Sequence, residues 1–246
     1  MKKSENVKGT ELKKTKGWHA LLGVVIAVSL ILIFLISSFE IGAYADYGFY
    51  EKEYEKYQVA DELYMEMPDI MEVTRYMMSY LRGGEETLSI ETTVEGSVRD
   101  FFNEQDRLHM KDVQDLFLGG LMLRRIAGIL LAAAAALLVW NKADWRTIIP
   151  KMYQRTLAVF LALVGVLGVL LSRDFTKYFE IFHQIFFDND LWIFDPAEDY
   201  MIRMLPEGFF YDMVMRIGGI FIALLLGFLA LTAVWRIVNK RNKNSL

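Results

Sequence analysis

The sequence predicts an all-α polytopic membrane protein with four transmembrane helices and two extracytoplasmic loops, the first of them large and partly helical with possible short strands. Three observations support this class. The chain of 246 residues is 54% hydrophobic. Its apolar residues are collected into four long blocks, and basic residues flank these blocks. A helix needs roughly 20 consecutive apolar residues to cross a bilayer, because no water is available there to satisfy its backbone.

Three of the four blocks are regular. Residues 20–39 and 217–235 carry no charge, and residues 152–171 contain only Arg155, whose long side chain can reach the interface. The N-terminal block has an alternative interpretation, because a basic start, an apolar run and Ala43-Tyr44-Ala45 resemble a cleavable secretory signal. Its apolar run is longer than the roughly 7–15 residues of a signal core, so we expect a retained span.

The second block is shorter than the others. Residues 126–140 are uncharged, but they reach spanning length only if residues 121–125 are included, which places Arg124 and Arg125 near a membrane face. The expected spans are residues 18–39, 116–140, 152–171 and 213–236.

The basic residues predict the orientation. Lysine and arginine concentrate in residues 1–17 and 237–246, and in residues 141–151 between spans two and three. Cytoplasmic flanks of membrane helices carry such an excess. Both termini are therefore expected in the cytoplasm, with residues 40–115 and 172–212 outside. The first outer loop has 19 acidic and 7 basic residues, a net charge of about −12 that the overall value of −4 conceals.

The first outer loop has three predicted parts. Pro68-Asp69 suits the start of a helix and Gly83-Gly84 its end, which predicts an amphipathic helix over residues 68–81 that either packs on the protein or lies at the membrane interface. In residues 87–94, apolar side chains alternate with hydroxyl side chains, which indicates a strand. Beyond Gly96 a helical period returns and runs directly into span two. Its apolar face consists of Val98, Phe102, Gln105, His109, Val113 and Leu116.

An aromatic stripe predicts a helix in the second outer loop, with His183 beside the stripe. Residues 188–190, Asp-Asn-Asp, then break the helix. Asp195-Pro196 together with Glu198 forms a capping box, which predicts another short helix that ends near Leu205. The stripe consists of Phe179, Phe182 and Phe186.

Two histidines, His109 and His183, are expected outside the cytoplasm, whereas His19 lies at the cytoplasmic edge. The simplest interpretation of a lone histidine on an apolar face is a packed core residue. Asp106 and Asp112, however, lie at i−3 and i+3 from His109, where a carboxylate can hold one ring nitrogen, fix the tautomer and raise the basicity. Both outer histidines are therefore candidates for proton transfer.

Four arginines gather at the outer ends of spans two, three and four. Each can be explained as a side chain that reaches from the apolar core to the interface. The alternative is that some of them face a cavity and bind an anionic or carbonyl group of a lipid-like substrate. The four residues are Arg124, Arg125, Arg173 and Arg216.

The residue types limit the chemistry. The chain has no cysteine and therefore no disulfide and no thiolate nucleophile. The G-x-S-x-G elbow of serine hydrolases and the H-E-x-x-H zinc pair are absent. A three-ligand zinc site formed by His109, His183 and one aspartate stays open. The aspartate candidates are Asp106, Asp112, Asp195 and Asp199. Otherwise the histidines indicate general acid–base chemistry on a substrate that supplies its own nucleophile.

Two long motifs occupy the outer loops. The first is N-E-x-x-R-L-H-M-x-D-V at residues 103–113. The second is F-H-x-x-F-F-x-N-D-x-W-x-F-D-P at residues 182–196, followed by L-P-E-G-F-F at residues 205–210. Together with the four spans, these motifs resemble the lipoprotein intramolecular transacylases, a family of bacterial membrane proteins. Residues 44–95 contribute nothing to this resemblance.

The resemblance implies an acyltransferase that moves the sn-2 acyl chain of a diacylglyceryl-modified N-terminal cysteine to the α-amino group of that cysteine, giving a lyso-form lipoprotein. His109 and His183 then correspond to the essential histidine pair of the family. Further orienting or pocket candidates are Asp106, Asp112, Trp192 and Asp195, together with the four arginines.

The expected partners are diacylated bacterial lipoproteins and membrane lipid, with no nucleic acid, no metal and no other cofactor. The expected location is the bacterial plasma membrane, with the active site on the extracytoplasmic side. Two other classes stay open: a non-catalytic membrane protein that binds a partner or senses pH, and a metal-dependent membrane hydrolase.

Overall fold

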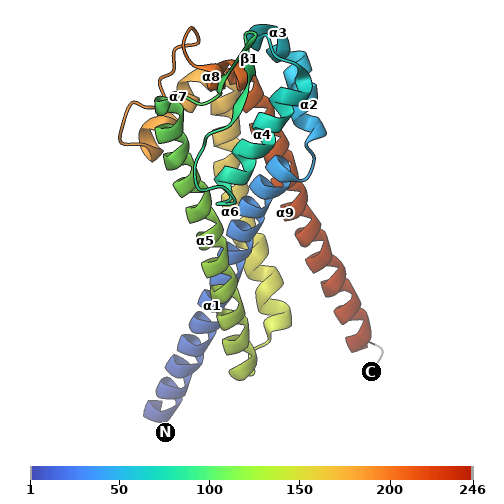
Figure 1. Ribbon diagram of the computed structural model, residues 1–246. Coiled ribbons are helices and arrows are strands. Elements are labelled where there is room, and N and C mark those ends of the chain that lie inside the picture. Colours follow the sequence, from blue (N-terminus) through green and yellow to red (C-terminus); the bar gives the residue numbers. More distant parts are fainter. Residues whose placement is uncertain (1, 245–246) are drawn as a thin grey trace. The chain divides into compact units, whose positions relative to one another are not determined.

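The computed structural model describes the backbone of residues 2–244 and the side chains of residues 17–170 and 172–238. Within these ranges, four helices are long and apolar enough to cross a membrane. They are α1 (Lys2–Tyr44), α5 (Glu104–Trp140), α6 (Trp145–Arg173) and α9 (Glu207–Asn244), each drawn as one unbroken helix in Figure 1. Shorter helices and one two-stranded sheet complete the fold. The predicted all-α membrane fold with four spans is confirmed.

The chain divides into two compact units. The span unit consists of Met1–Ser37, Leu123–Gly168 and Ile220–Leu246. The loop unit consists of Ser38–Met122 and Val169–Gly219. Both sequence motifs therefore belong to the loop unit.

In the span unit, α1 packs against each of the other long helices. Tyr153 of α6 donates its hydroxyl to the carbonyl of Leu225 on α9 (2.9 Å), which satisfies a buried polar group without water. Gly23 of α1 lies so close to α6 that an added Cβ would be 2.6 Å from Met152 Cγ. Small residues allow such close helix approach in membranes. One cluster joins α1, α6 and α9: Ala27, Ile31, Tyr153, Leu157, Phe221 and Leu225. Another joins α1 and α5: Leu22, Ile26, Ala134 and Leu138.

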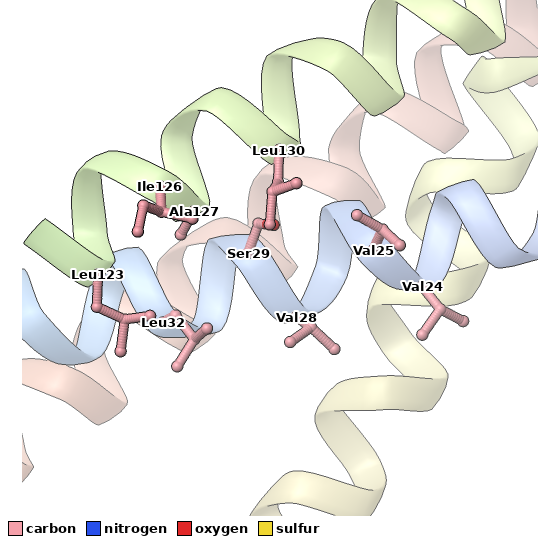
Figure 2. A pocket seen from close by; sticks show the side chains of 9 residues that line it. All are labelled: Val24, Val25, Val28, Ser29, Leu32, Leu123, Ile126, Ala127 and Leu130. Atoms are coloured by element: carbon pink, nitrogen blue, oxygen red, sulfur yellow. The ribbon is translucent and has the colours of Figure 1, made fainter.

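A shallow groove of about 260 Å³ runs between α1 and α5 in the span unit. Figure 2 shows its lining, in which apolar side chains of both helices surround Ser29, and that serine is only 4% exposed. The groove presents an apolar surface, which suits contact with lipid chains because these are as apolar as leucine.

The loop unit has a core of its own. Two short helices that the sequence analysis does not predict, α2 (Gly48–Lys56) and α3 (Val59–Leu63), contribute to it. They join α4 (Met67–Leu81), α8 (Tyr200–Met204) and the first turns of α9. The largest fully buried side chains of this core are Tyr50, Tyr54, Phe101, Phe102, Leu63, Ile70, Met204, Val59 and Val73.

The predicted amphipathic helix is confirmed as α4. Pro68 lies in its first turn, and Gly83, two residues beyond its end, adopts φ +76°, a left-handed conformation that glycine tolerates. Gly84 N then donates to Ser79 O (3.0 Å), which closes the end of the helix. The apolar face of α4 is buried in the loop-unit core, so this helix packs on the protein.

The segment after α4 is partly predicted. Strand β1 (Glu91–Val94) pairs with β2 (Ser97–Asp100) in antiparallel register, and Glu95 and Gly96 between them both have positive φ, as a two-residue hairpin turn requires. The helical period expected beyond Gly96 is therefore wrong in its first part: Val98 lies on β2 and is 73% exposed. Helix α5 begins only at Glu104, but it continues unbroken into the second span as predicted.

The capping box predicted at Asp195 does not start a helix. The Asp195 carbonyl accepts hydrogen bonds from the backbone N–H groups of Glu198 (2.9 Å) and Asp199 (2.8 Å), which closes a single turn. Helix α8 begins at Tyr200 and ends at Met204, so the predicted end near Leu205 is close whereas the predicted start is four residues too early.

Candidate active site

Asn103 determines where α5 begins and thereby where His109 lies. Asp106 N donates to Asn103 Oδ1 (2.8 Å), and Asn103 N donates to Asp106 Oδ2 (2.9 Å). This reciprocal pair satisfies two of the N–H groups that a helix start leaves without partners. Asp106 is thus a capping residue, and it makes no hydrogen bond with the His109 ring within the described residues, so its predicted orienting role stays a prediction.

His109 is buried among aromatic rings. Its ring centroid lies 5.2 Å from that of Phe187 and 5.3 Å from that of Phe194, both edge-on. Its Nδ1 is buried and has no hydrogen-bond partner within the described residues. The other predicted orienting residue, Asp112, instead accepts a hydrogen bond from Asn189 Nδ2 (2.9 Å). A buried polar atom without a partner costs about 1–3 kcal/mol, which indicates a group reserved for a ligand or for chemistry.

Helix α7 (Phe175–Phe186) carries His183, as the aromatic stripe predicts. Asp174 caps the helix by accepting a hydrogen bond from Lys177 N (3.1 Å), and the helix ends before residues 188–190. Part of its surface is apolar and exposed, with Ile185 70% and Phe186 52% exposed. His183, in contrast, is buried.

The helix itself sets the tautomer of His183. The Nδ1 atom of His183 lies 2.7 Å from the carbonyl oxygen of Phe179, and because a carbonyl only accepts, Nδ1 carries the proton. In the neutral ring, Nε2 then holds the free lone pair. Burial lowers the pKa of His183 from its ordinary value, and the hydrogen bond with Phe179 opposes this shift. At pH 7 the ring is therefore neutral, with Nε2 as the proton acceptor.

The two histidines lie in one site. The ring centroids of His109 and His183 are 6.1 Å apart and the rings are inclined by 30°. Trp192 stacks on His183 at 5.0 Å, and Phe179 meets the same ring edge-on at 4.5 Å. Phe187 contacts both histidines. Rings packed in this way exclude water, and a drier site strengthens every electrostatic interaction inside it.

The segment that follows α7 is held against α5 at residues that flank His109. Gln105 Nε2 donates to the Ile193 carbonyl (2.9 Å), and Asp112 accepts the hydrogen bond from Asn189. Gln105 and Asp112 lie four residues before and three residues after His109, which are positions on one side of a helix. The same face of α5 thus presents His109 and anchors the segment that carries Trp192.

A second tether holds the end of this segment. Asn103 Nδ2 donates to Asp199 Oδ1, and Asp195 N donates to Asp199 Oδ2 (2.7 Å). Asp195 itself accepts a hydrogen bond from Ala197 N (2.9 Å). Asp195 therefore shapes a turn, and its predicted role as a pocket residue stays a prediction.

Sequence reasoning missed three residues that organise the site: Asn103, Gln105 and Asn189. For two of them a signal was present, because Asn103 and Asn189 are defined positions of the two motifs. Gln105 gave no comparable signal, because it falls at a variable motif position and was assigned to the apolar face of the helix.

The four predicted arginines divide between the two units. In the loop unit, Arg216 lies 3.5 Å from a carboxylate oxygen of Asp46, and Arg173 is exposed. Arg124 and Arg125 belong to the span unit. A role of these arginines in substrate binding stays a prediction.

Among the residues that the structure describes, no three His, Asp or Glu side chains form a group that could hold a metal ion. The three-ligand set of His109, His183 and an aspartate is not assembled. Asp106 and Asp199 are hydrogen-bonded at the helix start, and Asp112 is bonded to a side chain of the segment after α7.

Fold and site together define an integral membrane protein with four long apolar helices and a buried histidine pair in its loop unit. Comparison with known families is more specific. The sequence pattern of the family described as lipoprotein intramolecular transacylase Lit matches residues 24–210. The chain belongs to this family of acyltransferases, which confirms the resemblance seen in its two motifs.

Solved structures share the fold. An in meso structure of the membrane integral lipoprotein intramolecular transacylase Lit from Bacillus cereus has a TM-score of 0.71 at 20% identity, covering 92% of this chain and 97% of that chain. A structure of that protein with a histidine-to-arginine mutation has a TM-score of 0.73 at 19% identity, covering 97% and 100%. At such identities the likeness establishes the fold alone. An uncharacterized protein of Aquifex aeolicus (strain VF5) is 24% identical over 209 residues, which are 80% of this chain and 87% of that protein.

Proposed function

We propose that this chain moves the sn-2 acyl chain of a diacylglyceryl-modified N-terminal cysteine to the α-amino group of the same cysteine. Family membership supports the reaction class. The observation that carries the proposed mechanism is the histidine pair, in which the rings of His109 and His183 are 6.1 Å apart and Nε2 of His183 is the acceptor.

The reaction needs no atom from outside the substrate. The amine nitrogen attacks the ester carbonyl carbon, and a C–N bond forms. The C–O bond to the glycerol then breaks, and the electron pair leaves with the glycerol oxygen. The nitrogen loses one proton and the oxygen gains one, so the total mass of the lipoprotein is unchanged. The protein has to move that proton and hold the two reacting groups together.

His183 is the base in this scheme. A substrate α-amine has an ordinary pKa of about 7.7–8.0 and must lose a proton to attack. Nε2 of His183 is available because Nδ1 donates to the Phe179 carbonyl. His109, whose Nδ1 has no partner, relays that proton: its ring takes up the proton from His183 at one nitrogen and gives the proton on its other nitrogen to the departing glycerol oxygen, so both rings end neutral. General acid–base catalysis of this kind typically contributes about 10²–10⁴-fold in rate.

The aromatic surroundings serve the same reaction in another way. Because nucleophile and ester belong to one molecule, holding them in an attack geometry can supply up to roughly 7–11 kcal/mol. Rings of Trp192, Phe187 and Phe194 surround the histidines and exclude water. Excluding water also protects the ester from hydrolysis, which would release the acyl chain instead of transferring it.

The charge pattern supports a topology for this chemistry. With both termini in the cytoplasm, as the basic flanks predict, the loop unit lies on the extracytoplasmic side of a bacterial plasma membrane. There the histidine pair meets lipoproteins that are anchored in the outer leaflet by their acyl chains, with membrane lipid around them.

The test is mass spectrometry of one defined diacylated lipoprotein before and after incubation with the purified protein, with fragmentation to locate each acyl chain. We expect one chain to move from glycerol to the cysteine nitrogen at constant mass. Loss of mass would indicate a hydrolase instead. An acyl chain that stays on the glycerol would indicate a membrane protein that binds a partner without catalysing transfer. Either result overturns the proposal.

A further inference from the structure

A continuous set of contacts links α5 to the ring of His183 through the segment after α7. Asn189 Nδ2 donates to Asp112 Oδ2 (2.9 Å). The Asn189 carbonyl in turn accepts a hydrogen bond from Trp192 Nε1 (3.0 Å). The indole of Trp192 then stacks on the imidazole of His183 at 5.0 Å, with the planes inclined by 26°.

We infer that Asp112 and Asn189 are positioning residues of the proposed transacylase reaction, and that they act through Trp192 on the His183 imidazole. The inference rests on the proposed function, because it assigns to these residues the placement of its base. It adds a second role for Asp112 to the one that the sequence suggested, for which the structure gives no hydrogen bond to the His109 ring within the described residues.

Asn189 is chemically suited to this role. Its amide group donates to the Asp112 carboxylate, and its amide oxygen accepts from Leu191 N (3.0 Å), so both ends of the side chain are used. A hydrogen bond to an ionised acceptor is shorter and stronger than one between neutral groups. The backbone of residue 189 is thereby fixed, and its carbonyl direction decides where the indole of Trp192 lies.

Two constraints then fix the imidazole of His183. The hydrogen bond from Nδ1 to the Phe179 carbonyl acts in the plane of the ring, and the stacked indole acts on its face. Rotation of the ring away from the observed direction would break the first contact or displace the second. Nε2 consequently keeps one direction, which is what a general base requires.

The effect of breaking this link is expected to be local. The same segment is also held by Gln105, which donates to the Ile193 carbonyl, and by Asp199, which accepts from Asp195 N and Asn103 Nδ2. A variant at residue 189 should therefore displace Trp192 without releasing the whole segment from α5.

The experiment exchanges the two partners. Asn189→Asp places two carboxylates together and should lower kcat by about tenfold or more, the factor that corresponds to loss of one charge-assisted hydrogen bond. The double variant Asp112→Asn with Asn189→Asp restores one donor and one acceptor, and should recover most of kcat. KM should change little, because neither residue is placed against the substrate. Asn141→Asp, the same chemical change in the span unit, is the matched control.

A spectroscopic readout tests the link without turnover. The emission of Trp192, obtained as the difference between the protein and its Trp192→Phe variant, should decrease when acid protonates the stacked imidazole. Asn189→Asp should reduce this pH response, and the double variant should restore it. Because no substrate is present, this result stands even if acyl transfer fails, whereas an inactive protein with an intact response would overturn only the proposed function.

Unchanged kcat and an unchanged emission response in Asn189→Asp would overturn the inference. If Asn189→Asp fails to accumulate, the kcat of the double variant tests the inference instead. Near-normal kcat in the double variant supports the exchange of partners. A double variant that folds but stays about tenfold or more slower than the unaltered protein shows that the two side chains do not act as a pair, and it contradicts the inference.

Discussion

Helices α5 and α7 each contribute one histidine to the site, but they hold it in different ways. On α7, Nδ1 of His183 is bonded to the carbonyl one turn earlier. On α5, Nδ1 of His109 is buried without a partner, and the nearby carboxylates serve the helix cap and the following loop. The difference indicates a division of roles, in which one ring has a fixed acceptor and the other can change its proton and tautomer.

The largest effect is expected from removing the rings themselves. His183→Ala and His109→Ala should each lower lyso-lipoprotein formation by about 10²–10⁴-fold, and the loss at His183 should be the larger because it removes the base. His19→Ala, at the cytoplasmic edge of the first span, is the matched control and should keep normal activity. If either His183→Ala or His109→Ala is well expressed and still forms the normal amount of lyso product, the proposed proton transfer by the histidine pair is wrong.

The aromatic contact on His183 should have the next largest effect. Trp192→Ala should reduce the rate roughly three- to tenfold, as expected from the 0.5–1.5 kcal/mol of an aromatic pair. Trp145→Ala removes a comparable stacked pair, that with Trp235 in the span unit, and serves as the control. Equal losses in both variants would show that the effect is general destabilisation. Steady-state kinetics with one defined lipoprotein give the comparison.

The activity should also respond to acid through His183. Because burial lowers the pKa of His183, its Nε2 stays unprotonated at pH 7 and is protonated only as the pH falls below the ordinary histidine value of about 6.5. The rate at saturating substrate should fall over that range, and NMR titration of labelled histidine should give the pKa directly. The unfolded chain takes up the proton first, so the folded state should lose stability over the same range. A titration of His183 centred above 6.5 would contradict this.

The smallest effect is expected at the cap of α5. Asp106→Ala removes the acceptor for Asn103 N and should lower the free energy of unfolding by about 1 kcal/mol, whereas Asp106→Asn keeps an acceptor and should be milder. Thermal unfolding in detergent measures both. If Asp106→Asn instead abolished activity at unchanged stability, Asp106 would belong to the reaction and not to the cap.

Much of the fold could be predicted from the sequence because membrane helices have strict requirements. Uncharged blocks identified the four spans, and Pro68 with Gly83 identified α4. The spacing of Val98 and Phe102 predicts a helix where the chain forms the turn at Glu95 and Gly96 and strand β2. A local backbone preference for the hairpin outweighed an apparent periodicity.

The site was predictable in its residues but not in its hydrogen bonds. The motifs pointed to His109 and His183, which the fold brings together. Spacing alone suggested that Asp106 and Asp112 serve His109, because neighbours on one helix can contact each other. The structure gives both carboxylates other partners, one at the helix start and one in a segment distant in sequence. Such long-range partners leave no periodic signal.

The order of the chain has a consequence for biosynthesis. The two motifs belong to one unit, yet residues 123–168 of the other unit lie between them. During synthesis the first motif is complete before α6 exists, and the second follows only after α6 has been made (Figure 1). A nascent chain therefore carries His109 alone until α6 and then α7, which holds His183, have been made.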